Sequence, residues 1–181
     1  TARPLHRAQS ILLLKITMLQ GNRMARITCK FGGTSLATAE QFRKVRDIVE
    51  SDERRRIIVV SAPGKRHSKD PKITDLLYLA QETAELNGDI SGPFDQVRER
   101  LLNIEKELGV DAGIKGEMEA LFADLQDGVS RDYAASRGEY LSGRLMAVYL
   151  DAEFVDPARY VIINAFGGVD PATYPDLTKT F

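Results

Sequence analysis

Hydrophobic and polar positions follow two different periods in the first third of the chain. Ile27 to Phe31 predicts a short strand, and Thr38 to about Glu50 predicts an amphipathic helix, with Thr38 and Gln41 at capping-box spacing. "RIIVVSA", Arg56 to Ala62, is apolar on both faces, which is typical of a central strand in a parallel sheet. A strand, a helix and a strand in this order predict a right-handed βαβ unit.

Helical periodicity dominates the middle of the chain, which predicts four more helices. The first begins at "ITDLLYLAQ" and ends near Gly88, and the second is opened by Pro93 and closed by Gly109. The third is marked by Met118, Leu121, Phe122 and Leu125, and the fourth is "SRGEYLSGRLMAVYLDAE", with Leu141, Leu145 and Val148 on one stripe. "EFVD" predicts a short strand and "RYVIINA" another. The expected fold class is α/β, with a mainly parallel sheet flanked by helices and a helical insertion around residues 88–128.

The two ends of the chain do not follow this pattern. Residues 1–23 contain a short apolar run interrupted by Lys15, too short to span a bilayer and without a small-residue cleavage site after it. Regular patterning begins just after Met24, so residues 1–23 are expected to be a non-native or disordered leader. "DLTKTF" ends the chain without a helix-stop signal.

Composition narrows the function classes. The chain of 181 residues is 43% hydrophobic and 28% charged, with a net charge of -1, so no general basic field points to nucleic acid or to a membrane surface. Its single cysteine, Cys29, cannot form an internal disulfide, which favours a reducing, cytoplasmic compartment. With only His6 and His67 besides that cysteine, a dedicated transition-metal site is not expected.

"KFGGTS" lies where the first predicted strand gives way to a helix. In open α/β sheets, ligands bind outside the carboxyl ends of the strands. Gly32 and Gly33 would let backbone N–H groups approach an anion, and Lys30 would add a full charge. The lysine precedes the glycines, so this is neither a Walker A loop nor a dinucleotide fingerprint. A tight turn with a lysine extended into solvent is the alternative.

Three further positions have both a functional and a structural interpretation. Ser61 in "VVSAPGK" would reach the same edge of the sheet as Lys30, or it would belong to an ordinary βα loop. Thr74 begins a predicted helix, where threonine is a common N-cap. Glu139 follows Ser136 at capping-box spacing, so it would either hold its own helix or bind a cationic substrate group.

Together these segments resemble one family. "KFGGTS", "VVSAPGK", "ITDLL" and "SRGEYLSGRLMA" occur in the order and at the spacing of aspartate kinases, of the amino acid kinase superfamily, and the resemblance covers Met24 to Phe181. It implies a three-layer αβα fold and phosphoryl transfer from Mg²⁺-ATP to the side-chain carboxylate of L-aspartate, the first step of lysine, threonine and methionine synthesis. It also implies a homo-oligomer in the full-length parent.

The resemblance also assigns roles to residues. Lys30 would neutralise charge on the transferred phosphoryl group, and Thr74 and Glu139 would bind aspartate, with Glu139 pairing with its α-ammonium. The ATP- and phosphate-binding residues would be Lys30, Phe31, Gly32, Gly33, Ser35 and Ser61. Because the nucleophile is already a carboxylate, catalysis would rest on positioning and charge stabilisation rather than on a strong base.

The sequence departs from the family in lacking several segments of a complete catalytic domain. A complete catalytic domain of the family should add a "GRGGSD"-like segment, the strands that hold adenine and usually paired ACT domains, so residues 24–181 are expected to be its N-terminal portion. We expect the 181 residues alone to have no aspartate kinase activity and to self-associate or aggregate, which light scattering would show. Two alternatives stay open: an amino acid kinase with a different acceptor, and a truncated, inactive domain that acts as a binding or docking module.

Overall fold

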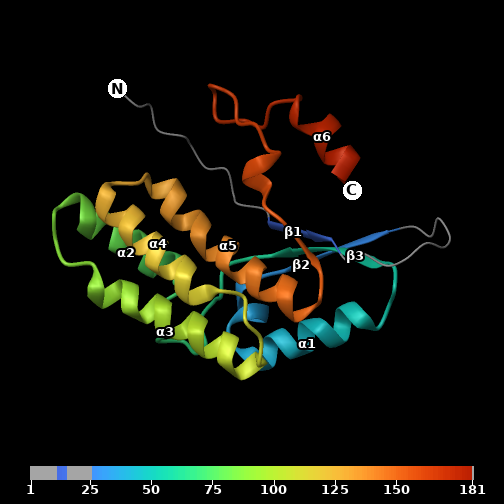
Figure 1. Ribbon diagram of the computed structural model, residues 1–181, viewed down its shortest axis with the longest axis horizontal. Helices are drawn as coiled ribbons and strands as arrows, with labels where there is room; N and C mark the ends of the chain where they lie inside the picture. Colours follow the sequence, from blue (N-terminus) through green and yellow to red (C-terminus); the bar gives the residue numbers. More distant parts are fainter. Residues whose placement is uncertain (1–11, 16–25, 181) are drawn as a thin grey trace.

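The computed structural model describes residues 12–15 and 26–180 of the chain. It is an α/β protein in which the elements follow one another along the chain as shown in Figure 1. The strands are β1 (Leu12–Lys15), β2 (Ile27–Phe31), β3 (Arg55–Val60) and β4 (Glu153–Val155). The helices are η1 (Gly33–Leu36), α1 (Ala39–Glu50), α2 (Ile73–Glu85), α3 (Ser91–Leu108), α4 (Ile114–Asp127), α5 (Arg131–Tyr149), η2 (Pro157–Arg159) and α6 (Thr173–Thr180).

The predicted βαβ unit is confirmed. β2 and β3 pair in parallel, with Lys30 opposite Val59 and Phe31 opposite Val60, and α1 connects them. Thr38 is the N-cap of α1, where its hydroxyl accepts a hydrogen bond from the Gln41 N–H at 3.3 Å. The sheet order is β2-β3-β1-β4, so β3 is an inner strand as its double-sided apolar pattern predicts.

β1 was not predicted. It lies inside the segment expected to be a leader, yet it pairs antiparallel with both β3 and β4. The expectation of disorder is therefore wrong for Leu12–Lys15, and the parallel pair β2–β3 sits in a sheet with two antiparallel pairs. The other residues of the segment, 1–11 and 16–23, lie outside the described part of the chain.

The hydrophobic core lies between one face of the sheet and helices α1 to α5. Ile58 and Val60 of β3 belong to it, and Cys29 and Phe31 of β2 pack against it. The largest fully buried side chains are Leu36, Phe42, Ile58, Ile73, Leu77, Phe94, Ile90, Leu101, Ile114, Met118 and Leu125. In Figure 1, α2 to α5 form a bundle beside the sheet, α1 runs beneath the strands, and the C-terminal segment with α6 rises above them.

The ends and buried faces of helices α2, α3 and α4 can be compared with the sequence predictions. α3 ends at Gly109, which has the left-handed φ of 68° expected of a C-cap glycine. Helix α2 begins at Ile73 with Lys72 at the N-cap position, so Thr74 lies inside the helix and is not its cap. Helix α4 buries Met118, Leu121 and Leu125, as its spacing predicts.

Two predictions near the C-terminal end are wrong. Helix α5 begins at Arg131, and its N-cap is Ser130, whose hydroxyl accepts a hydrogen bond from the Tyr133 N–H at 3.2 Å. Ser136 therefore lies inside the helix, where its hydroxyl donates to the Tyr133 carbonyl at 2.7 Å, and it forms no capping box with Glu139. "RYVIINA" forms no strand, and its Ile163 makes only an isolated antiparallel bridge with Val169.

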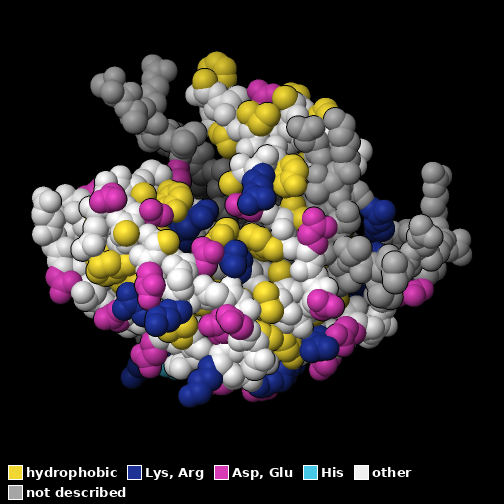
Figure 2. Space-filling model, in the orientation of Figure 1, with side chains coloured by type: hydrophobic (Ala, Val, Ile, Leu, Met, Phe, Trp, Pro, Cys, Tyr) yellow, Lys and Arg dark blue, Asp and Glu magenta, His cyan; other side chains and the backbone are white. Residues whose placement is uncertain are grey.

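The surface carries charges of both signs. Figure 2 shows acidic and basic side chains interspersed over the face in view, with hydrophobic side chains gathered at the top, over the C-terminal segment. That segment exposes Ile162, Phe166, Val169 and Tyr174, with Phe166 96% accessible. Val148, predicted on the buried stripe of α5, is 45% exposed. No helix in the described ranges is long and apolar enough to cross a membrane.

Candidate active site

The carboxyl ends of β2 and β3 meet backbone to backbone. The Ser61 N–H donates to the Phe31 carbonyl at 3.1 Å, and the Gly64 N–H donates to the Gly33 carbonyl at 2.8 Å. A Cβ on Gly33 would lie 2.8 Å from the Ala62 carbonyl oxygen, and one on Gly64 would lie 2.6 Å from the Gly33 carbonyl carbon. Only glycine permits this approach at both positions.

Helix α5 packs against the same strand ends through a third glycine, Gly138. A Cβ on Gly138 would lie 2.8 Å from the Ala62 Cβ and 3.3 Å from Ile73 Cγ2. We call the contact of Gly33, Gly64 and Gly138 around Ala62 the glycine junction. It joins both strand ends, the start of α2 and the middle of α5, so it fixes where the neighbouring polar residues lie.

Glu139 is brought to the glycine junction because it follows Gly138 on α5. Burial raises the pKa of its carboxyl group, while hydrogen bonding with the backbone N–H groups of Ala62 and of Glu139 itself acts in the opposite direction. In the described part of the chain the carboxylate has no ion pair. A half-buried carboxylate whose local partners are N–H groups is suited to receive a cationic ligand group.

Ser61 and Thr74 lie on either side of the same junction. Ser61 is the first residue after β3 and is half-buried. Thr74 is the second residue of α2, and the N–H of its neighbour Ile73 donates to the Pro63 carbonyl at 3.4 Å. The functional interpretation of Thr74 is strengthened, because the capping role that would have explained this residue is taken by position 72.

Lys30 points away from this group. Phe31 packs against the core, and neighbouring residues of a strand face opposite sides of the sheet, so the Lys30 side chain lies on the other face, where it is exposed. The structure thus places the Lys30 backbone beside the junction but does not bring its ammonium group together with Glu139. Among the described residues Lys30 forms no ion pair.

The turn after Lys30 offers backbone donors. Gly32 is extended and η1 begins at Gly33, with the Ser35 N–H bonded to the Gly32 carbonyl at 2.9 Å. The N–H groups of Gly33 and Thr34 donate to no backbone acceptor within the described residues. Because a Cβ on Gly32 would meet nothing within 4 Å, an anion can approach the chain closely here.

Two buried charged residues beside this site were missed from the sequence. Arg100 of α3 is 5% exposed and Asp70 of the loop between β3 and α2 is 4% exposed. The signal for Arg100 was present, because it falls on the apolar stripe of its helix with Val97 and Ile104. An arginine at a core position needs buried acceptors, and this one finds them in that loop.

A hollow elsewhere in the described residues, between α4 and α5, offers less chemistry than the glycine junction. It is lined by charged and aromatic side chains that include Tyr133, Arg137 and Tyr140. Its acidic groups are already occupied: Tyr133 donates to Asp124 at 2.5 Å, and Arg144 pairs with Glu117 at 3.2 Å. At the glycine junction, by contrast, the Glu139 carboxylate has no ion pair among the described residues.

The chain belongs to the amino acid kinase family, whose model matches residues 25–174. Within that family it is similar to aspartokinases. It is 35% identical over 165 residues to aspartokinase 3 of Bacillus subtilis, covering 83% of this chain and 36% of the relative, and 31% identical over 178 residues to the chloroplastic aspartokinase 1 of Arabidopsis thaliana, covering 84% and 30%. The chain therefore spans about a third of the length of the curated relatives it matches.

Solved structures give the same result. An aspartate kinase from Clostridium acetobutylicum superposes with a TM-score of 0.84 at 41% identity, covering 86% of this chain and 36% of that one. Aspartokinase III of E. coli in complex with aspartate and ADP gives a TM-score of 0.55 at 27% identity, covering 70% of this chain and 29% of that one. The predicted αβα fold class and the predicted family are confirmed.

Proposed function

We propose that the protein carrying this chain is an ATP-dependent aspartate kinase, which transfers the γ-phosphoryl group to the side-chain carboxylate of L-aspartate and forms 4-phospho-L-aspartate. The observation that carries the proposal is the glycine junction. It holds two strand ends with free backbone donors beside a half-buried carboxylate that has no ion pair among the described residues, in a chain similar to an enzyme solved with aspartate and ADP.

The phosphate side of the site would be built on β2 and β3. The Gly33 and Thr34 N–H groups are available to phosphate oxygens, and the positive end of the following helical turn adds to them. Phe31 and Ser35 would hold the ends of this turn, and Ser61 would lie by the nucleotide phosphates. Lys30, exposed beside the turn, would reach the transferred group and neutralise its developing charge.

The acceptor side would be built on α2 and α5. Glu139 would bind the α-ammonium of aspartate, because an ammonium ion restores the charge balance that burial of the carboxylate disturbs. Thr74 would donate its hydroxyl proton to an aspartate carboxylate. With the nucleophile already ionised, these residues need only orient it toward the phosphorus atom.

Mg²⁺ would enter this site with the nucleotide. The described residues hold no group of three His, Cys, Asp or Glu side chains that could bind a metal ion by themselves. Mg²⁺ keeps several waters and is commonly held by one or two carboxylates together with substrate phosphates. In the proposed enzyme it therefore belongs with ATP, and none of the described residues is assigned to it.

The wider role follows from the reaction. We propose that the enzyme acts in the cytoplasm, at the first step of lysine, threonine and methionine synthesis, and that it is a homo-oligomer at full length. The chain spans about a third of its relatives, so we expect the 181 residues alone to be inactive.

The test is an acceptor panel on the full-length protein that carries this chain. Purified protein is incubated with Mg²⁺-ATP and L-aspartate, L-glutamate or N-acetyl-L-glutamate, and acyl phosphate is trapped as the hydroxamate. We expect product with L-aspartate alone, in a one-to-one ratio with ADP. Product with another acceptor would support a kinase activity but contradict L-aspartate as its acceptor. No product with any acceptor would contradict the proposal as a whole.

A further inference from the structure

A loop connects the two halves of the candidate site. It runs from Ser61, directly after β3, to Lys72, which precedes α2 and lies two residues before Thr74. The loop is strongly basic, and Lys65, Arg66, His67 and Lys69 are exposed. Ordering such a segment costs conformational entropy, so something must hold its ends at a fixed separation.

Arg100 holds both ends of this loop from the neighbouring helix α3. One nitrogen of its guanidinium, Nη2, donates to the Gly64 carbonyl, and the other, Nη1, donates to the Pro71 carbonyl at 2.7 Å. Gly64 belongs to the glycine junction, and Pro71 stands three residues before Thr74. A single buried side chain therefore fixes the phosphate side and the acceptor side of the site relative to each other.

Asp70 completes the arrangement from inside the loop. Its carboxylate lies 3.5 Å from Arg100 Nη1 and 2.7 Å from Arg66 Nη2, and it also accepts the Arg66 backbone N–H at 2.9 Å. The Arg66 guanidinium holds the pKa of Asp70 well below its usual range, so the carboxylate stays charged at neutral pH. Asp70 thus balances the buried charge of Arg100 while it folds the loop back on itself.

We propose, on the basis of the proposed function, that Arg100 is a positioning residue of the kinase site: by clamping the Gly64 and Pro71 carbonyls it sets the distance between the phosphate-binding turn and Thr74. It acts through the loop and touches neither substrate. The planar guanidinium is required, because a lysine ammonium cannot direct two fixed donors at two carbonyls in this way. Helix α3 thereby acquires a role in the site that its distance along the chain does not suggest.

The first readout is amide hydrogen exchange on the full-length protein, at Gly64, Arg66, Asp70 and Ile73, whose N–H groups are all hydrogen-bonded within the loop or to Gly33. Arg100→Leu should accelerate exchange at these amides at least tenfold relative to those of α1. Arg98→Leu is the matched control, because Arg98 lies on the same helix, is half-buried and pairs with Asp95 rather than with the loop. It should leave the loop amides unchanged.

The second readout is steady-state kinetics of the full-length protein. Arg100→Leu should raise KM for both ATP and aspartate at least tenfold, and Arg100→Lys should fall between this variant and the unmodified protein. If Arg100→Leu does not fold, the same comparison is made with Arg100→Lys alone. Unchanged KM values, or exchange that accelerates equally throughout α1 to α5, would overturn the proposal. Absence of aspartate turnover in the unmodified protein would instead contradict the proposed function, and loop exchange would still decide whether Arg100 clamps the loop.

Discussion

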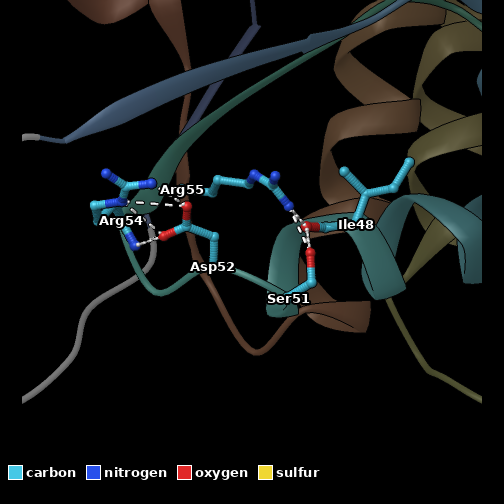
Figure 3. Close-up of polar contacts among 5 residues, drawn as sticks. All are labelled: Ile48, Ser51, Asp52, Arg54 and Arg55. Atoms are coloured by element: carbon cyan, nitrogen blue, oxygen red, sulfur yellow. Dashed lines mark hydrogen bonds and ion pairs between the residues drawn. The ribbon is translucent and has the colours of Figure 1, made fainter.

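The two ends of β3 show opposite ways of using charge. At its amino end, the turn from α1 is closed by arginines that are fully engaged: Arg55 donates to the Ile48 carbonyl and the Ser51 hydroxyl, and Arg54 pairs with Asp52 at 2.7 Å (Figure 3). At its carboxyl end, the glycine junction leaves Glu139 without a cation and Lys30 without an anion among the described residues.

The difference separates a structural turn from a candidate binding site. Arg55 donates to the Ile48 carbonyl and the Ser51 hydroxyl at the end of α1, so its charge serves the fold. At the glycine junction three glycines hold the backbone together without using the nearby charges. Charged groups that the fold leaves unpaired are available to a ligand, and this contrast assigns function to one end of the strand.

The largest effect on stability is expected at the junction itself. Gly64→Ala would place a Cβ among backbone atoms of Gly33 and Thr34, which cannot move aside as a side chain can. We expect a loss of about 3 kcal/mol in the free energy of unfolding, measured by urea titration. Gly116→Ala in α4 is the control, because a Cβ there meets nothing within 4 Å, and it should stabilise the chain by about 0.5 kcal/mol. Equal effects of the two changes would contradict the close packing.

The next largest effect on stability distinguishes a fully buried acid, Asp70, from a partly exposed one, Asp52. Asp70→Asn removes the charge that balances Arg100, and we expect a loss of about 2 kcal/mol at pH 7. The folded-state pKa of Asp70 is lowered, so its contribution is present above the unfolded value of 3.8 and disappears as pH falls through the folded-state pKa. Asp52→Asn, in the turn of Figure 3, should change the free energy of unfolding little, both at pH 7 and at acidic pH. A larger loss from Asp52→Asn would reverse the contrast.

The smallest expected effect on stability, that of Glu139→Gln, is a stabilisation rather than a loss. Burial raises the folded-state pKa of Glu139, so its contribution to stability is complete below the unfolded value of 4.5 and is lost as pH rises through the folded-state pKa. Glu139→Gln should therefore stabilise the chain at pH 8, by up to about 1 kcal/mol, and lose this advantage near pH 4. Thermal unfolding at the two pH values measures the difference. Destabilisation at pH 8 would mean that the carboxylate has a structural partner.

Local signals explain what the sequence predicted well. The β2–α1–β3 unit has two apolar strands, an amphipathic helix and a threonine N-cap, which all favour the same structure. The glycine turn was recognised as a candidate phosphate site because it follows the carboxyl end of a strand, where α/β folds bind ligands. The ligand role of Glu139 came from the resemblance to aspartate kinases.

Tertiary packing explains what the sequence predicted wrongly. Ser130 and Ser136 are both acceptable N-caps, and only the packing of Ala134 against the core decides that α5 begins at the first. "RYVIINA" has strand propensity, yet Asp170 and Thr173 bond back to Ile162 and make this segment a compact turn. The antiparallel neighbour of β3 comes from Leu12–Lys15, whose short apolar run alone does not indicate a partner.

The clamp was missed for a related reason. The residue pattern places Arg100 on an apolar stripe, but it does not say which carbonyls the guanidinium reaches, because these lie 29 and 36 residues away in the chain. Close approaches such as that of Gly64 to Gly33 likewise depend on two loops at once. Long-range contacts of this kind became visible only in the folded structure.

The most direct test of a ligand role for the unpaired charges compares two cations at opposite ends of this sheet in the full-length protein. Lys30→Met removes a cation that has no ion pair among the described residues, and Arg54→Met removes a cation that pairs with Asp52. We predict that Lys30→Met lowers kcat for aspartate phosphorylation about a thousandfold with an unchanged melting temperature, whereas Arg54→Met leaves kcat as it is. Equal kcat values for Lys30→Met and the unmodified protein would contradict the assignment of this edge of the sheet as the active site.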